Sequence, residues 1–172
     1  MHETAPRDAH RRDQTSPLYP GAKVDAPHIQ CCVFVYGTLR RGEVNDINRL
    51  RPAPRLLGHA TLRGVLYDLG AYPGLQLSSS KAGDRRPPPF TDVAGEVYAI
   101  DAALEAVLDE IEEVFPQQSG EYLKRRCHVL LNGQSHQVLL YEIAPDRVEG
   151  RVVIEGGDWV AYRKRRDGHL TA

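Results

Sequence analysis

Acidic residues on one predicted helix offer the clearest acid–base chemistry in this sequence of 172 residues. Placing residues 101–115 at intervals of 100° gathers the apolar positions into one stripe. Glu112 and Glu105 then fall at its boundary, whereas Glu113 falls on the solvent side. A carboxylate at the edge of an apolar face is partly desolvated, which raises its pKa toward that of a useful general base. The helical pattern alone does not separate Glu112 from Glu105, and boundary glutamates commonly just extend into solvent.

The cysteines and histidines indicate no comparable chemistry. Cys31 and Cys32 are adjacent and would point to opposite faces of a strand, while Cys127 makes the total odd. No CxxC pair is present, so the sequence encodes neither a zinc ribbon nor a redox pair. Cys127 and His128 would also splay apart on a strand. We expect free thiols in a reducing cytoplasm, with a reactive cysteine as the alternative.

Composition and missing motifs exclude several classes of protein. The formal net charge of −1 provides no basic excess for nucleic acid or an acidic membrane surface. The longest apolar run, residues 31–36, is far shorter than the roughly twenty residues that a membrane-spanning helix needs. Neither a phosphate-binding GxxxxGK[ST] loop nor a dinucleotide-binding GxGxxG turn occurs, and HExxH and GxSxG are also absent.

The elements that would position these residues are several strands and one substantial helix. Asp101 is the expected N-cap of the helix over residues 101–115, and Asn132-Gly133 predicts a type I′ turn in a hairpin. Gly70, Pro73 and Gly74 are interpreted as turn residues. The pattern predicts an α+β domain with a curved or closed sheet. The other predicted segments are strands at 31–36, 60–68, 92–100, 122–131 and 137–143, a weak helical stripe at 44–50 and an exposed loop at 81–89.

Three regions are expected along the chain. Residues 1–30 carry four prolines and few branched aliphatic side chains, which predicts a flexible tail. Residues 31–163 contain the predicted strands and helix and form the expected domain. Residues 164–172 are assigned to a basic C-terminal tail, because the basic run at 162–166 is interpreted by default as solvated, with an anion contact as the alternative.

Four segments together resemble the γ-glutamylcyclotransferase-like family, in its γ-glutamylamine cyclotransferase branch. The first strand enters a Tyr-Gly-Thr-Leu loop within residues 33–40, and residues 64–74 are similar to the second strand and its Tyr-Pro turn. Residues 93–98 match a Gly-Glu-Val-Tyr strand. Residues 108–112, with Tyr122 downstream, resemble the helix motif Leu-Asp-x-[Phe/Ile]-Glu and its following tyrosine. Each motif is weak alone, but their shared order covers nearly the whole expected domain.

The resemblance implies a fold, a reaction and a set of site residues. The implied fold is a compact, mixed, barrel-like sheet flanked by helices, with a small cavity at one end. The implied reaction converts a γ-glutamyl group to 5-oxoproline and releases the attached amine or amino acid. Glu112 matches the catalytic glutamate of the family. The expected substrate-binding residues are Tyr36, Gly37, Thr38, Leu39 and Tyr122, with a small γ-glutamyl compound as substrate and no cofactor or metal.

Other functions stay open at this point. The same scaffold could serve a non-catalytic ligand-binding or interaction protein, because a fold does not fix a function. Hydrolysis of a γ-glutamyl amide, or transfer to another amine, is a second alternative. The chain also carries a longer stretch before Tyr122, Gln117–Gly120, than many family members do, which would reshape the rim of the cavity. The sequence determines neither the leaving amine nor the oligomeric state.

Overall fold

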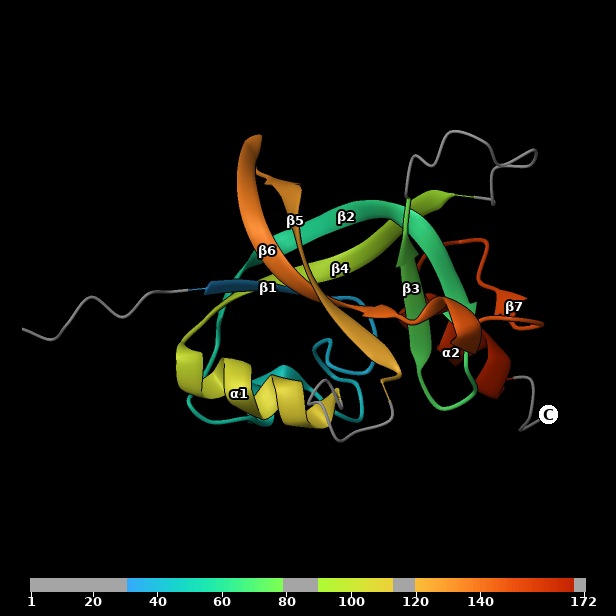
Figure 1. Cartoon of the computed structure of the whole chain (residues 1–172), viewed down its shortest axis with the longest axis horizontal. Coiled ribbons are helices and arrows are strands. Elements are labelled where there is room, and N and C mark those ends of the chain that lie inside the picture. Colours follow the sequence, from blue (N-terminus) through green and yellow to red (C-terminus); the bar gives the residue numbers. More distant parts are fainter. Residues whose placement is uncertain (1–30, 79–89, 113–119, 169–172) are drawn as a thin grey trace, which may run out of the picture.

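The structure, a computed structural model, describes residues 31–78, 90–112 and 120–168 and combines a seven-stranded sheet with two α-helices (Figure 1). Helices α1 and α2 lie toward opposite ends of the molecule. The elements in chain order are β1 (Cys31–Val35), the 3-10 helix η1 (Ile47–Arg49), β2 (Arg55–Asp68), β3 (Pro73–Leu77), β4 (Thr91–Ile100), α1 (Ala102–Ile111), β5 (Tyr122–Leu131), β6 (Gln134–Ile143), the 3-10 helix η2 (Pro145–Arg147), β7 (Val152–Val153) and α2 (Trp159–Gly168).

The sheet has the strand order β3-β2-β4-β1-β6-β5, and β7 pairs with β2. The β1–β6 pair is parallel, and the other pairs are antiparallel. Between β5 and β6, Asn132 and Gly133 have φ values of 51° and 78°, which confirms the predicted tight turn. The sheet is therefore mixed, as the resemblance implied.

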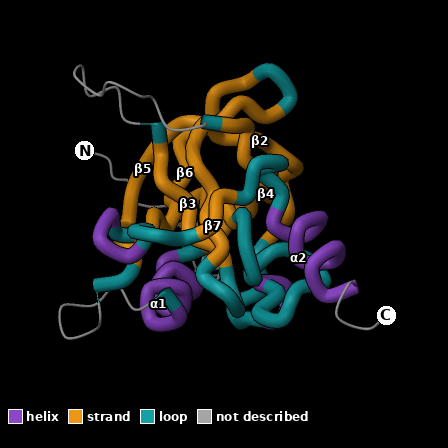
Figure 2. The backbone as a smooth tube through the Cα atoms, turned by 90° about the vertical axis from the view of Figure 1, so that its right-hand side faces the viewer, coloured by secondary structure: helices purple, strands orange, loops and turns teal. Residues whose placement is uncertain are grey.

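The sheet curls into a half-barrel, so that strands distant in the pairing order meet (Figure 2). Gly58 of β2 lies against Leu131 of β5, because a Cβ added to Gly58 would come within 2.8 Å of the leucine side chain. Gly74 of β3 packs in the same way against Ile143 of β6. Glycines allow these close approaches because they carry no side chain. The observed architecture confirms the predicted α+β class.

Two apolar clusters stabilise the curled sheet from its two faces. Alternation along β1 places Phe34 in the first cluster, with Trp159 of α2, and places Val33 and Val35 in the second. The second cluster includes Leu104 and Leu108 of α1. Each helix therefore covers a different part of the sheet, and α1 lies next to the strand that leads into the Tyr-Gly-Thr-Leu loop.

Helix α1 begins as predicted but ends earlier than its apolar stripe suggests. The Asp101 carboxylate accepts a hydrogen bond from the Leu104 amide at 2.8 Å, which confirms the N-cap. The last helical residue is Ile111, and Glu112 is the C-cap. Ile111 was expected in the core but is 39% exposed, because it lines the cavity at the end of the helix. Glu113 and the rest of the predicted stripe lie outside the described residues.

Three other predicted segments differ from the structure. Pro73 and Gly74 begin β3 instead of forming a turn, and proline is tolerated there because β3 is an edge strand and Pro73 is its first residue. β2 begins at Arg55, five residues before the predicted start at position 60. The helical stripe at 44–50 is reduced to η1. The expected tail at 1–30 and the loop at 81–89 are outside the described residues.

The basic run at 162–166 is helical, contrary to the expectation of a solvated tail. It belongs to α2, which extends to Gly168, so the predicted boundary between residues 163 and 164 falls inside a helix. Trp159 is fully buried at the start of α2. Arg163 donates two hydrogen bonds of 2.8 Å to Glu43, and Arg166 lies 3.2 Å from Asp68. These contacts hold α2 against the domain despite its weak apolar pattern.

The three cysteines are free, as expected from their spacing. In the parts of the chain that the structure describes, no helix combines the length and the apolar character needed to cross a membrane.

Candidate active site

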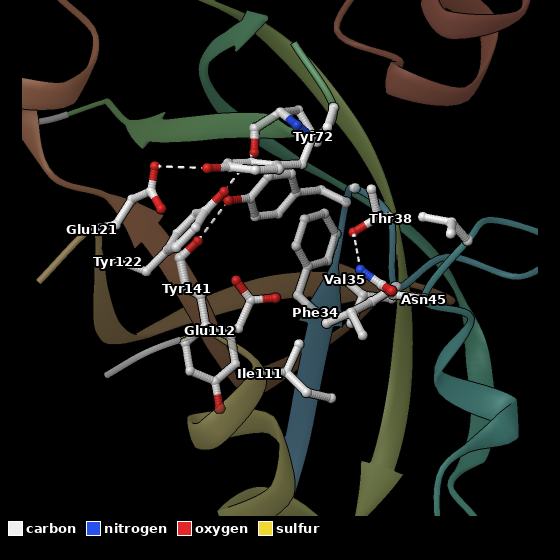
Figure 3. A pocket seen from close by; sticks show the side chains of 16 residues that line it. Phe34, Val35, Thr38, Asn45, Tyr72, Ile111, Glu112, Glu121, Tyr122 and Tyr141 are labelled. Carbon is white, nitrogen blue, oxygen red and sulfur yellow. Dashed lines mark hydrogen bonds between the residues drawn. The ribbon is translucent and has the colours of Figure 1, made fainter. Parts of the chain in front are cut away.

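A cavity of about 290 Å³ opens where β1 ends and faces the C-terminal end of α1 (Figure 3). Its walls come from β1 and the loop after it, the turn before β3, the end of α1 and the segment entering β5. The lining residues are Phe34, Val35, Tyr36, Gly37, Thr38, Leu39, Val44, Asn45, Ala71, Tyr72, Pro73, Ile111, Glu112, Glu121, Tyr122 and Tyr141.

All six residues that the sequence analysis assigned to a site line this cavity. They come from three segments that are far apart in the sequence: the loop after β1, the end of α1 and the first residue of β5. The fold therefore brings together Glu112, Tyr36, Gly37, Thr38, Leu39 and Tyr122.

Glu112 projects from the end of α1 into the cavity (Figure 3). Its amide still donates to the Leu108 carbonyl at 2.9 Å, which fixes the backbone. No hydrogen bond from a described residue contributes to the pKa of its carboxyl group. Burial raises the pKa of Glu112 to about 7, and the nearby Glu121 carboxylate adds to this shift. At neutral pH the group is therefore divided between its acidic and basic forms.

Glu105 shares the azimuth of Glu112 but has a different environment two turns earlier. Its carboxylate lies 2.6 Å from the Lys124 ammonium group, which also contacts Asp109 at 2.8 Å. Glu105 is thus neutralised by a cation and does not line the cavity. The two positions that the helical pattern left equivalent are distinguished by their neighbours in space.

Tyr36 and Tyr122, the two tyrosines that were predicted to bind the substrate, form hydrogen bonds with the main chain through their hydroxyl groups. Tyr36 donates to the Tyr141 carbonyl at 2.7 Å and accepts from the Leu75 amide at 3.3 Å. Tyr122 donates to the Pro73 carbonyl at 2.9 Å. Burial raises the pKa of both phenols well above the usual value, so both stay neutral and rigid. Their rings form cavity wall, and their hydroxyls link β1, β3, β5 and β6.

The loop after β1 lines the cavity and carries main-chain amides that have no partner among the described residues. Among the described residues, the amides of Gly37, Thr38 and Leu39 donate no hydrogen bond. The loop is held by its carbonyl groups, because Asn45 donates to Thr38 at 3.0 Å and Ile47 donates to Leu39 at 3.0 Å. This arrangement leaves a fixed group of amides able to bind an anionic oxygen.

Packing is a second reason for a glycine at position 37, besides the access of a ligand to the backbone of the loop. A Cβ at this position would lie 2.8 Å from the Pro73 ring, so the loop and the start of β3 approach each other directly. The sequence analysis did not foresee this contact.

Several lining residues were missed by the sequence analysis. Tyr72 donates to Glu121 at 3.0 Å, and Asn45 donates to the Thr38 hydroxyl at 3.2 Å. Tyr141 donates to Asp109 at 2.7 Å. Tyr72 lies within a segment that carried the resemblance, and Glu121 adjoins Tyr122, so proximity to these motifs was the available signal. Asn45 carried none.

Metal ligation has little support in the described part of the chain, where no three histidine, cysteine, aspartate or glutamate side chains are grouped to hold an ion. The chemistry available in the cavity is that of a carboxyl group of pKa about 7, main-chain donors and aromatic walls.

A sequence profile of the family described as "Gamma-glutamyl cyclotransferase, AIG2-like" matches residues 33–161. The chain belongs to this family, and the match covers all of the residues that form the cavity.

Individual relatives agree with this assignment. The chain is 34% identical over 135 residues to γ-L-glutamyl-butirosin B γ-glutamyl cyclotransferase of Niallia circulans, covering 76% of each chain. Among solved structures, an AIG2-like protein from Mus musculus superposes with a TM-score of 0.57 at 24% identity, covering 75% of this chain and 88% of that one. YkqA from Bacillus subtilis gives a TM-score of 0.59 at 23% identity; the match covers 81% of this chain but spans only 43% of YkqA. The structural likenesses show the shared fold.

Proposed function

We propose that the protein cyclises a γ-glutamyl group to 5-oxoproline and releases the attached amine, with Glu112 as the general acid and base. The observation that carries the proposal is the Glu112 carboxyl group, with a pKa of about 7, facing a cavity that is also lined by residues 37–39, whose amides donate no hydrogen bond among the described residues. The related protein of Niallia circulans, named γ-L-glutamyl-butirosin B γ-glutamyl cyclotransferase, supports the reaction type.

The first step needs a base. The α-amine of the glutamyl group is mostly protonated at neutral pH and becomes a nucleophile only after losing a proton. The Glu112 carboxylate accepts that proton. The amine nitrogen then attacks the γ-carbonyl carbon, a C–N bond forms, and the carbonyl electron pair moves onto oxygen.

The second step needs an acid. The tetrahedral intermediate collapses, the bond to the departing nitrogen breaks, and protonated Glu112 returns its proton to that nitrogen. The ring nitrogen, which still carries two protons after the attack, loses one of them as the lactam forms, and that proton passes to the released amine. The products are therefore 5-oxoproline and the amine as its ammonium ion, and Glu112 ends as the carboxylate from which it began. One carboxyl group serves both steps because its pKa lies near the working pH.

The loop after β1 binds the oxygen atoms of the substrate that carry or acquire negative charge. The amides of Gly37, Thr38 and Leu39 bind the α-carboxylate of the glutamyl group and stabilise the oxygen that becomes anionic. The rings of Tyr36 and Tyr122 confine the flexible glutamyl chain, which favours the folded conformation in which nitrogen meets carbonyl.

The test replaces Glu112 with glutamine and measures release of 5-oxoproline from γ-glutamyl amines. We expect turnover to fall by roughly 10²–10⁴-fold, the usual contribution of general acid–base catalysis. Glu110→Gln is the matched control, because Glu110 is an exposed residue of the same helix and should keep nearly full activity. Retention of most activity by Glu112→Gln would refute the assignment.

Product identification separates the remaining alternatives. Release of glutamate would indicate hydrolysis, and a new γ-glutamyl amide would indicate transfer. Ligand binding without any product would indicate a non-catalytic binding protein.

A further inference from the structure

Among the described residues, the charge of the cavity wall is entirely acidic. Of the sixteen lining residues, only Glu112 and Glu121 carry a charge, and lysine, arginine and histidine are absent from this set. The cavity therefore offers an anionic ligand main-chain donors on the loop side but no cationic side chain anywhere among its described walls.

Two basic residues of segments that adjoin the cavity are already engaged by other carboxylates. Lys124 contacts both Glu105 and Asp109 within 2.8 Å, on the far side of the Tyr141 hydroxyl. The Arg40 side chain does not line the cavity, and its guanidinium group lies 2.8 Å from the Asp158 carboxylate. Neither side chain lines the cavity, so their charges do not offset those of the two glutamates.

Glu121 lies across the cavity from the loop. Figure 3 shows the Glu112 carboxylate between Thr38 on one side and Glu121 on the other. Tyr72 donates to one oxygen of Glu121 at 3.0 Å, which orients the carboxylate, and the second oxygen has no hydrogen-bond donor among the described residues. This second oxygen is free to accept from a ligand.

The geometry of the proposed reaction decides which part of a substrate reaches Glu121. In the five-membered ring that forms, the nitrogen lies between the carbon bearing the α-carboxylate and the carbon bearing the leaving group. When the loop amides bind the carboxylate and Glu112 lies at the nitrogen, the leaving group points away from the loop. That direction leads to the wall that contains Glu121.

We propose that Glu121 binds a second, positively charged group on the leaving amine, so that the preferred substrates are γ-glutamylated diamines and related polycationic amines. This inference rests on the proposed function and adds to it the class of leaving group. γ-Glutamyl amino acids are disfavoured, because their leaving group brings a carboxylate to a wall that carries only negative charge.

A matched series of three substrates tests the inference. The γ-glutamyl amides of 1,4-diaminobutane, butylamine and 4-aminobutanoate have four-carbon leaving groups that differ in their terminal charge. We expect kcat/KM to fall in that order by about tenfold at each step, as one charge-assisted hydrogen bond gained or one repulsion added would produce. Equal values, or a preference for the 4-aminobutanoate compound, would overturn the inference while leaving the proposed function intact.

The variant Glu121→Gln assigns the preference to one residue. We expect the ratio of kcat/KM between the diaminobutane and butylamine compounds to drop from about tenfold to nearly one, because the glutamine keeps the shape but loses the charge. Glu110→Gln removes the same charge from the exposed face of α1 and should preserve the wild-type ratio.

Two other outcomes are informative. An equal loss toward all three substrates in Glu121→Gln would mean that Glu121 binds the glutamyl ammonium group, which overturns the inference. Absence of 5-oxoproline from every substrate with the folded wild-type protein would instead overturn the proposed function, and the inference with it.

Discussion

Two sets of buried or half-buried carboxylates lie on either side of the loop after β1, and their surroundings differ. Beneath the loop, Glu43 and Glu96 are each 4% exposed, and both face arginines. In the cavity, Glu112 and Glu121 face no basic side chain among the described residues. The first set is paired with cations, whereas the second set has no counter-charge among the described residues, and burial raises the pKa of Glu112.

The set beneath the loop fixes its shape through several donors. Glu96 accepts from the Arg41 amide at 3.0 Å and the Tyr98 hydroxyl at 2.9 Å, and Arg40 lies 3.5 Å away. Glu43 accepts both hydrogen bonds from Arg163. These contacts hold the loop so that its amides stay in place without any ligand. Neutralising a carboxylate should therefore have opposite effects on stability in the two sets.

The largest expected effect is a gain in stability from Glu112→Gln. The folded protein holds the Glu112 proton up to pH 7, whereas the unfolded chain loses it near pH 4.5, so wild-type stability falls as pH rises through this window. The variant does not lose stability in this way, because glutamine does not ionise. We expect its unfolding free energy at pH 8 to exceed that of wild type by up to about 3 kcal/mol. Denaturant titrations at pH 8 and pH 5 check this, and the gain should nearly vanish at pH 5.

Glu43→Gln should have the opposite sign. This change removes the charge that binds Arg163 of α2 through two hydrogen bonds of 2.8 Å. We expect a loss of about 2 kcal/mol in unfolding free energy, which is typical of hydrogen bonds to a charged group. The same denaturant titration measures it. A Glu43→Gln variant that is more stable than the wild-type protein would contradict the expected difference between the two sets of carboxylates.

The pH dependence of turnover sharpens the contrast within the cavity. Because the first step uses ionised Glu112, kcat/KM should rise with pH and level off above about pH 7, with a tenfold change per unit on the acidic limb. Initial rates of 5-oxoproline formation from pH 5 to pH 9 give the profile. A midpoint near pH 4.5 would mean that the cavity does not desolvate Glu112.

The smallest expected effect is a shift of that midpoint in Glu121→Gln. The Glu121 carboxylate contributes to the raised pKa of Glu112, so its removal should lower the midpoint of the acidic limb. The same pH series, with the butylamine substrate, detects the shift. An upward shift would contradict the placement of these two like charges in one cavity.

Local patterns were sufficient to predict much of the sheet and the first helix. The apolar run of β1, the Asn132-Gly133 turn and the Asp101 cap are short-range signals that the structure confirms. β3 was missed because Pro73 and Gly74 are typical turn residues, and only the edge position of the strand makes them acceptable. α2 was missed because its stability comes from Trp159 and distant ion pairs instead of from a periodic apolar face.

Only those site residues that belong to a family motif could be predicted from the sequence. Glu112 and the Tyr36–Leu39 loop came from the resemblance, and the structure places them around one cavity. Glu121 adjoins the Tyr122 motif but is not part of it, so its place in the cavity wall became apparent only from the structure. The raised pKa of Glu112 likewise depends on burial and on Glu121, and neither is encoded in the helical period.

The contact between Gly37 and Pro73 has a consequence for how relatives of this protein could diverge. The Gly37 backbone and the Pro73 ring lie in direct contact at this point of the cavity, because a Cβ on Gly37 would lie 2.8 Å from that ring. The Pro73 carbonyl also binds the Tyr122 hydroxyl. Glu121 stands outside this junction. Under the proposed function, a substitution at position 121 would change which amine the enzyme prefers. The part of the cavity that binds the glutamyl group would keep its dimensions. A single substitution could therefore change the specificity without altering the catalytic residues.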